Sequence, residues 1–296
     1  MVKIQLSPTV VLALAAVLLW PREVSSQQPT CRVSTEIVRL AELPEASGVA
    51  ASRRTPGIFW AHNDSGDPVL FALDERGAVK GRVRVTGAQV DDWEDIAVGP
   101  CARGSCLYIG DIGDNSGKRD RITLYRAQEP APGDTATDAV EVFHATYPDG
   151  AHDAESLFVT PDSDVFIITK GDPGSVALYR FPRPLGSKGS MQLQRVGEPL
   201  AGGRVDAKDR LTAADISQNG EWVAVRTTHY VTFYRTTDLI AGRWRQAARF
   251  DVTGLGERRG EGLAFAAKDI VVLVGEGGGL TRNPGTFATL ACSLTR

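Results

Sequence analysis

Three glutamates occupy equivalent places in a repeated pattern of the sequence. Glu94, Glu155 and Glu261 each stand directly before a short apolar segment, and Asp92 and Asp153 precede the first two by two residues, as Asp-Trp-Glu and Asp-Ala-Glu. Carboxylate oxygens suit Ca²⁺ or, less well, Mg²⁺, and paired carboxylates also serve as general acid and base. If the fold gathers these groups, their repulsion must be offset by a cation, by shared protons or by basic side chains.

A second set of polar residues follows the next apolar segment of several copies. It includes His62, Asn63, Asp111 and Lys170. A histidine can act as general base or metal ligand, although a His beside Asn-Asp is equally explained by holding a turn. Lys170 closes an apolar segment, where we expect it to be a counter-ion for Glu155 or an anion-binding group.

From these residues we predict a Ca²⁺ site on a common axis. Its ligands are drawn from Glu94, Glu155, Glu261, Asn63 and Asp111, and the catalytic residues from His62, Asp111 and Lys170. The alternative is structural, with each glutamate capping backbone N–H groups of the neighbouring unit. The sequence has no Gly-x-Ser-x-Gly elbow, His-Glu-x-x-His, P-loop or dinucleotide fingerprint, which sets those chemistries aside.

The elements that must position these residues form an internal repeat. Its five copies begin at Ser47, Glu94, Glu155, Thr212 and Glu261, a period of roughly 45–60 residues. Each copy has two apolar segments joined by a turn and a third apolar segment, and a more polar fourth segment closes the unit. Four short strands at this period are typical of a β-propeller. In each hairpin the first strand starts at the end opposite the turn, so the acidic positions share one face and the turns the other.

The fold class predicted is therefore all-β, a single propeller with five blades. Six blades are the alternative, if a long connection hides degenerate strands. The stretches 127–138 and 182–210 are read as surface excursions because they are rich in Pro, Gly and charge. The last copy has only three strands, so we expect the strand-like residues 31–40 to supply its outer strand and close the ring.

Four cysteines fit this closure. Cys101 and Cys106 flank the turn of the second copy and are predicted to pair, which leaves Cys31 and Cys292 to join the closing strand to the last strand. A disulfide across so long a loop is worth about 3–5 kcal/mol. No CxxC spacing accompanies the cysteines, which argues against a metal site.

The N-terminus predicts export. Residues 1–26 have a positive start at Lys3, an apolar run at 10–20 and small residues for cleavage at 24–26, so we expect a secreted or periplasmic domain over 27–296. The alternative is an uncleaved anchor, but the run is short for a membrane span and none is expected after processing. The net charge is −3 with no basic run, which excludes nucleic acid as a partner. We expect a monomer with a small-molecule or sugar ligand on the acidic face.

Several motifs resemble a group of exported bacterial β-propellers. They are Ser47-Gly-Val-Ala with Trp60-Ala-His-Asn-Asp64, Asp92-Trp-Glu-Asp-Ile-Ala97, and Tyr108-Ile-Gly-Asp-Ile-Gly-Asp-Asn115. The wider group includes the calcium-dependent gluconolactonase/paraoxonase propellers, the phytase-like esterases and the SdiA-regulated proteins. The first two imply an axial Ca²⁺ and hydrolysis of a lactone or phosphate ester. This chain departs from them, because its repeats indicate five blades rather than six and do not match their full ligand set.

Three functions follow from this interpretation. The first is a Ca²⁺-dependent hydrolase of an ester, lactone or phosphoester. The second is a binding module that holds a sugar, peptide or protein on the acidic face. The third is a glycosidase, which needs a pair of carboxyl groups about 5–10 Å apart beside a sugar-sized cleft, whereas a convergent cage of oxygens favours the metal.

Overall fold

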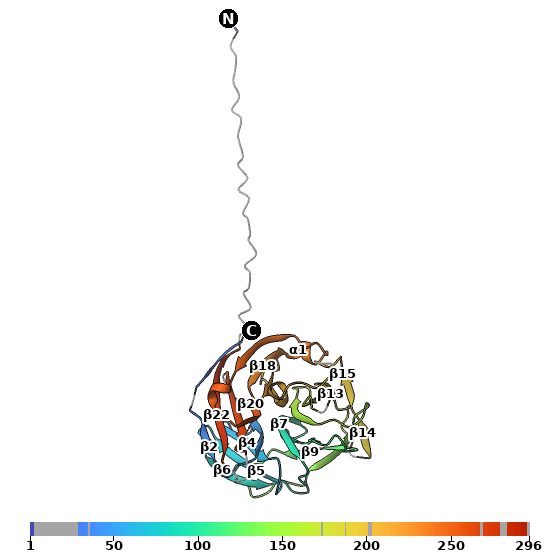
Figure 1. Cartoon of the computed structure of the whole chain (residues 1–296). Coiled ribbons are helices and arrows are strands. Elements are labelled where there is room, and N and C mark those ends of the chain that lie inside the picture. Colours follow the sequence, from blue (N-terminus) through green and yellow to red (C-terminus); the bar gives the residue numbers. More distant parts are fainter. Residues whose placement is uncertain are drawn as a thin grey trace.

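Five antiparallel sheets surround a central axis in the computed structural model (Figure 1). The structure describes residues 1–2, 29–34, 36–172, 174–186, 188–200, 203–266, 269–278 and 283–294. The sheets are the blades of a five-bladed β-propeller, which confirms the predicted fold class and excludes the six-bladed alternative. Within the described ranges, helix is limited to α1 (Thr236–Leu239) and two short 3₁₀ segments.

Each blade is a meander whose inner strand comes first in the sequence. Blade 1 is β3 (Ala46–Ala51), β4 (Ile58–Asn63), β5 (Val69–Asp74) and β6 (Val79–Arg84); blade 2 is β7 (Trp93–Cys101), β8 (Gly104–Asp111), β9 (Ile122–Gln128) and β10 (Glu141–Thr146); blade 3 is β11 (Ala154–Val159), β12 (Val165–Thr169), β13 (Leu178–Arg180) and β15 (Gln194–Val196); blade 4 is β16 (Leu211–Ile216), β17 (Trp222–Thr227), β18 (Tyr230–Arg235) and β19 (Gln246–Asp251); blade 5 is β20 (Arg259–Phe265), β21 (Ile270–Glu276) and β22 (Gly285–Ser293), with β1 (Thr30–Val33) and β2 (Val38–Leu40).

The hydrophobic core is divided among the interfaces between blades. Successive residues of β12 show how this arises: Val165 and Ile167 pack toward blade 2, whereas Phe166 and Ile168 pack toward blade 4. Because side chains alternate across a strand, a strand that is buried on both faces is a continuous apolar run rather than an alternating one. Each pair of neighbouring blades shares one such cluster, so the ring has no separate centre of packing.

The outer strand of blade 3 lies inside a stretch that we expected to be a surface excursion. Residues 194–196 form β15, and residues 190–192 form β14 (Ser190–Gln192), which pairs in parallel with β10 at the edge of blade 2. Both strands are three residues long and largely polar, so they carry no hydrophobic period. The connection therefore completes one blade and extends its neighbour.

The N-terminal residues close the ring as predicted. Both β1 and β2 pair antiparallel with β22, so the closing strand is split in two rather than continuous. Cys31 lies opposite Cys292 in the register and forms a disulfide with it, with a Cα–Cα distance of 4.0 Å. The predicted Cys101–Cys106 disulfide is also present, beside the β7–β8 turn.

The predicted signal sequence lies almost entirely outside the described residues. No helix among those that the structure describes has the length and hydropathy of a membrane span. The two disulfides are compatible with an oxidising compartment.

The closing disulfide predicts a large stability difference. We expect the double variant Cys31→Ser/Cys292→Ser to lose about 3–5 kcal/mol, because the crosslink restrains a loop of 261 residues. For a chain of this size the melting temperature should fall by roughly 10 °C in a calorimetric scan. The matched control is Cys101→Ser/Cys106→Ser, which opens a loop of only 5 residues and should lose less. Equal losses in the two variants would contradict the proposed contribution of ring closure.

Candidate functional site

The five inner strands share an irregularity near their first residues. The pairing of each inner strand with the second strand of its blade shifts register there, between Ala46 and Val49, Trp93 and Asp95, Ala154 and Ser156, Leu211 and Ala213, and Gly260 and Leu263. A β-bulge places an extra residue against one partner and re-aims the side chain at that point. The three repeated glutamates and their counterparts Ser47 and Thr212 all lie at these shifts.

These residues line a cavity of about 350 Å³ at the axis. Seven acidic side chains border it, namely Glu45, Asp64, Asp92, Glu94, Glu155, Glu261 and Glu276. Three basic side chains, Lys170, Arg210 and Arg259, also border it, and no aromatic side chain is among the described lining residues. The cavity is therefore hydrophilic and carries an excess of negative groups.

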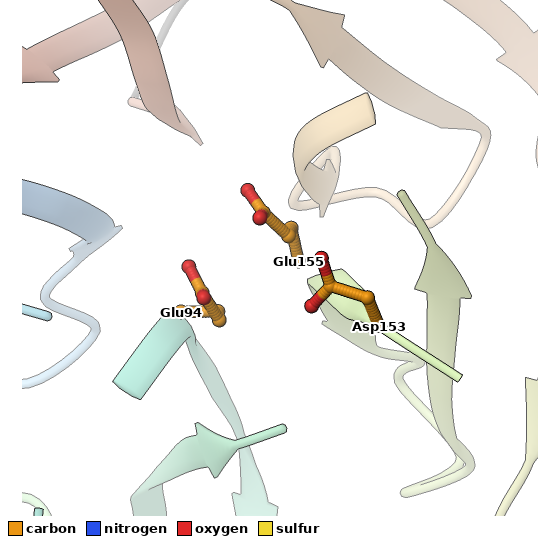
Figure 2. Close-up of side chains that lie close together, drawn as sticks. All are labelled: Glu94, Asp153 and Glu155. Carbon is orange, nitrogen blue, oxygen red and sulfur yellow. The ribbon is translucent and has the colours of Figure 1, made fainter. Parts of the chain in front are cut away.

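Three carboxylates converge most closely on one side of this cavity. Glu94, Asp153 and Glu155 are buried and each offers an oxygen within 4.8 Å of those of the other two. They come from blades 2 and 3, at the ends that face the axis (Figure 2). Lys170 ion-pairs with Glu155, and its Nζ lies 3.3 Å from an Asp153 oxygen and 3.2 Å from the Asn115 side-chain oxygen. Lys170 thus pairs with two of the three clustered carboxylates, and Glu94 makes no ion pair among the described residues.

The electrostatics of the cluster reflect this shortage of cations. Burial raises the pKa of Glu94 well above its ordinary value, and the nearby carboxylates Glu155 and Asp92 raise it further. Burial also raises the pKa of Glu155 to about 7, although Lys170 opposes the shift. A buried carboxylate that lacks a nearby cation is stabilised by a proton or by a bound metal ion.

A glycine makes room for part of the cluster. A Cβ added at Gly113 would collide with carboxylate oxygens of both Asp92 and Glu94. Burial and then Asp153 raise the pKa of Asp92, while a hydrogen bond with Glu94 lowers it. The Gly in the Asp-Ile-Gly-Asp-Asn segment therefore leaves the space that these two carboxylates occupy, and a larger residue would displace them.

Glu261 enters the cavity from blade 5 and is held by its backbone. The Thr212 hydroxyl donates to the Glu261 carbonyl oxygen at 3.0 Å, and Arg226 Nη1 donates to the next carbonyl, that of Gly262, at 2.6 Å. Arg226 is completely buried and is paired with Glu257. Burial and then Glu155 raise the pKa of Glu261, and Arg226 partly offsets them.

His62 does not reach the cavity. Its ring is fully buried between blades 1 and 2, edge-on to Trp93 at 5.4 Å, and its Nδ1 lies 3.0 Å from the Asn63 carbonyl oxygen. Burial lowers the pKa of His62 to about 4. The sequence pattern suggested that His62 follows the second strand. In the structure it belongs to β4, and its side chain therefore points into the interface between blades.

Asn63 and Asp111 are also placed apart from the cavity. The Asn63 side-chain oxygen accepts the backbone N–H of Glu45 at 3.1 Å. The Asp111 carboxylate accepts the N–H groups of Asp91 and Asp92 and a 2.7 Å hydrogen bond from Arg119. Both residues end second strands, where their oxygens satisfy loop backbone instead of facing the axis. Of the predicted set, the structure brings together Glu94, Glu155, Glu261 and Lys170.

Two aspartates outside the predicted site link neighbouring inner strands by hydrogen bonds. One Asp95 oxygen accepts from Leu157 N at 2.8 Å and Ala214 N at 3.2 Å, so this carboxylate joins blade 2 to blades 3 and 4. Asp215 accepts from Phe265 N at 2.8 Å and joins blade 4 to blade 5. The capping of neighbouring backbone that was the alternative role for the glutamates is thus performed by two aspartates of the inner strands β7 and β16.

Asp64 is a further cavity residue that the pattern did not isolate. It is half-buried at the blade 1 side of the cavity, and one of its oxygens has no hydrogen-bond partner among the described residues. Burial, together with the nearby carboxylates of Glu45, Glu276 and Asp92, raises the pKa of Asp64 to about 7. The only feature of the sequence that indicates a site role for Asp64 is its position after His62-Asn63 in the first copy of the repeat.

Comparisons with known proteins show similarity at the level of fold. No protein-family model and no curated protein matches the chain. The PQQ-bound aldose sugar dehydrogenase of Streptomyces coelicolor is 11% identical, with 90% of this chain and 99% of that chain covered and a TM-score of 0.51. A gluconolactonase of Xanthomonas campestris is 13% identical over 89% and 95% of the two chains, with a TM-score of 0.44. At these identities the likeness concerns the fold alone.

The raised pKa of Glu94 predicts a pH-dependent stability. Between its ordinary pKa of 4.5 and its higher folded pKa, the folded state holds a proton that the unfolded chain has lost, so stability falls as pH rises. In EDTA, Glu94→Gln should therefore gain melting temperature relative to the unmodified protein between pH 5 and pH 8. Each pKa unit corresponds to about 1.4 kcal/mol, or a few degrees.

The matched control for this measurement is Glu141→Gln. Arg126 lowers the pKa of Glu141, so this residue is ionised in both states across the same pH interval and its variant should show a constant difference. His62, whose lowered pKa gives the opposite slope below pH 6.5, is common to all three proteins. A Glu94→Gln difference that stays flat or shrinks toward pH 8 would contradict the buried-charge interpretation.

Proposed function

We propose that this protein is a metal-dependent hydrolase with Ca²⁺ held in the axial cavity by Glu94, Glu155 and Glu261. The substrate class proposed is an ester, lactone or phosphoester. The observation that supports this most strongly is the convergence of buried carboxylates around a single ammonium group.

The donor set fits a hard divalent cation. All the charged donors are carboxylate oxygens, the ligands that Ca²⁺ prefers, and side-chain hydroxyls of Ser47 and Thr212 stand at the equivalent positions of the remaining blades. The oxygens of Glu94, Asp153 and Glu155 approach within 4.8 Å, which is the convergent arrangement rather than the pair separated across a sugar ring. The raised pKa values of Glu94 and Glu261 indicate carboxylates that a cation would stabilise in their ionised form.

The remaining polar groups suit a hydrolytic step. Bound Ca²⁺ would polarise the carbonyl or phosphoryl oxygen of a substrate. Lys170 holds Glu155 and Asp153 in place through its ion pairs. Asp64, with a pKa near 7 and access to the cavity, is suited to take a proton from the attacking water. We assign this role to Asp64 and not to His62, because the histidine is sealed between blades.

The location and partners follow the same proposal. We infer export to a secreted or periplasmic site, which the two disulfides support. The ligand is a small hydrophilic molecule, since the described cavity lining has no aromatic or large aliphatic side chain. We propose a monomer that binds no nucleic acid.

The test is titration of the mature protein with Ca²⁺, Mg²⁺ and EDTA by calorimetry, followed by a panel of ester, lactone, phosphoester and glycoside substrates. We expect Ca²⁺ to bind, and chelation to abolish hydrolysis of one of the first three classes. Glu94→Gln and Glu261→Gln should each weaken Ca²⁺ binding at least tenfold, with Glu141→Gln as the control on an outer strand. Asp64→Asn should lower kcat by about 10²–10⁴ with little change in Ca²⁺ affinity.

Each outcome of this titration separates the candidates. If the protein binds no Ca²⁺ and hydrolyses a glycoside in the presence of chelator, catalysis depends on an acid–base pair of carboxyl groups and not on a metal. Ca²⁺ binding with no hydrolysis of any substrate would leave a binding module in which the metal is structural. Both results would overturn the proposed activity.

A further inference from the structure

A second, larger cavity lies on the opposite face of the propeller. It has a volume of about 680 Å³ and is bordered by the β3–β4 turn of blade 1 and by the start of β21 in blade 5. The turns of the hairpins gather on this face, whereas the acidic cavity is formed by the opposite ends of the inner strands. The cavity follows the seam between the first and last blades, and we call it the seam cavity.

The walls of the seam cavity are largely apolar. Pro56, Ile58 and Phe59 line it from blade 1, and Ile270 and Val272 from blade 5. Ile270 is one of the few large apolar side chains that are exposed in the described part of the chain. A cavity of this size with apolar walls and few polar groups is typical of sites for small organic ligands.

Two exposed polar side chains lie at one end of the seam cavity. Arg53 and Gln218 also border a small cavity at the axis, so they mark the place where the two spaces meet. Among the described residues, Arg53 makes no ion pair or hydrogen bond, and Gln218 makes no side-chain hydrogen bond. The nearby Asp215 makes no ion pair with Arg53, although burial raises its pKa and the charge of Arg53 lowers it, and its oxygens accept the backbone N–H groups of Ile216 and Phe265.

A negative side chain marks the outer part of the cavity. Glu75, in the β5–β6 turn, lies against Gly57 and has no ion-pair partner among the residues that the structure describes. Among the lining residues, Arg53 therefore places a positive charge at one end of the cavity and Glu75 a negative charge at the other. With the apolar wall between them, this arrangement favours a molecule with one acidic head and an uncharged tail.

We propose that the seam cavity binds a small amphipathic monocarboxylate. Its carboxylate receives hydrogen bonds from the Arg53 guanidinium and the Gln218 amide, and its hydrocarbon tail lies along Ile58, Phe59 and Ile270. A charge-assisted pair with Arg anchors the head, and burial of the tail supplies the remaining affinity. This site is separate from the axial metal site and does not depend on the activity proposed for it.

The experiment is calorimetric titration with straight-chain monocarboxylates below their micellar concentrations. The size of the cavity suggests chains of about eight to twelve carbons. We expect affinity to rise about fourfold for each added methylene until the cavity is full. The alcohol and the trimethylammonium compound of the same chain length should bind at least tenfold more weakly than the carboxylate.

Variants assign the two halves of the site. Arg53→Gln should weaken carboxylate binding at least tenfold while leaving binding of the alcohol unchanged, and Ile270→Asn should weaken both. Arg103→Gln is the matched control, because Arg103 is an exposed arginine on a turn of the same face that does not line the cavity. Melting curves for each variant establish that it is folded.

The results decide the proposal in either direction. Carboxylate binding that depends on Arg53 and on tail length supports it. No binding, equal binding of carboxylate and trimethylammonium compounds, or equal effects of Arg53→Gln and Arg103→Gln would overturn it. Ca²⁺ titration of Arg53→Gln should match that of the unmodified protein, so failure here and failure of the axial metal site are distinguishable.

Discussion

The structure depends on how buried negative charge is tolerated at the axis of a ring. Five inner strands begin at the same place, so the side chains at the five equivalent positions necessarily approach one another. Three of those positions are glutamate in this chain, and Asp92 and Asp153 add to them. Repulsion is offset by Lys170, by hydrogen bonds between acids and by the raised pKa values that follow from burial. The arrangement of the inner strands therefore sets the electrostatics of the cavity, because it decides which carboxylates share the axis.

The blades can carry this charge because they are fixed to each other by means other than the core. Apolar clusters fill every interface between blades, but they do not specify how far each inner strand approaches the axis. Asp95 and Asp215 do specify it, since each carboxylate accepts backbone N–H groups from a neighbouring inner strand. Arg226 adds a third link, from blade 4 to carbonyl groups of Gly262 and Val274 in blade 5. In β7 two successive acidic residues thus have distinct roles, since Glu94 lines the cavity and Asp95 links the blades.

Much of this architecture could be predicted from the sequence, and the failures have a common origin. The repeat of apolar segments gave the blade number, the face of the acidic positions and both disulfides, because burial on two faces leaves a strong apolar signal. The outer strand at 194–196 was missed because it is short and polar. The sequence pattern grouped three residues at the ends of second strands with the glutamates, namely His62, Asn63 and Asp111. Whether such a residue faces the axis depends on the bulge of the inner strand and on the last residue pair between the two strands. Asp95 was overlooked for the same reason, since its neighbour Glu94 faces the cavity.

The closing strand has a consequence for how the molecule is made. Within the described part of the chain, β1 and β2 pair only with β22, so these two strands have no sheet to join until β22 is available. As the chain is made from its N-terminus, blades 1 to 4 can assemble one after another while both flanks of the growing arc stay open. The circle closes, and the thiols of Cys31 and Cys292 can be oxidised to their disulfide, only once β22 has been made.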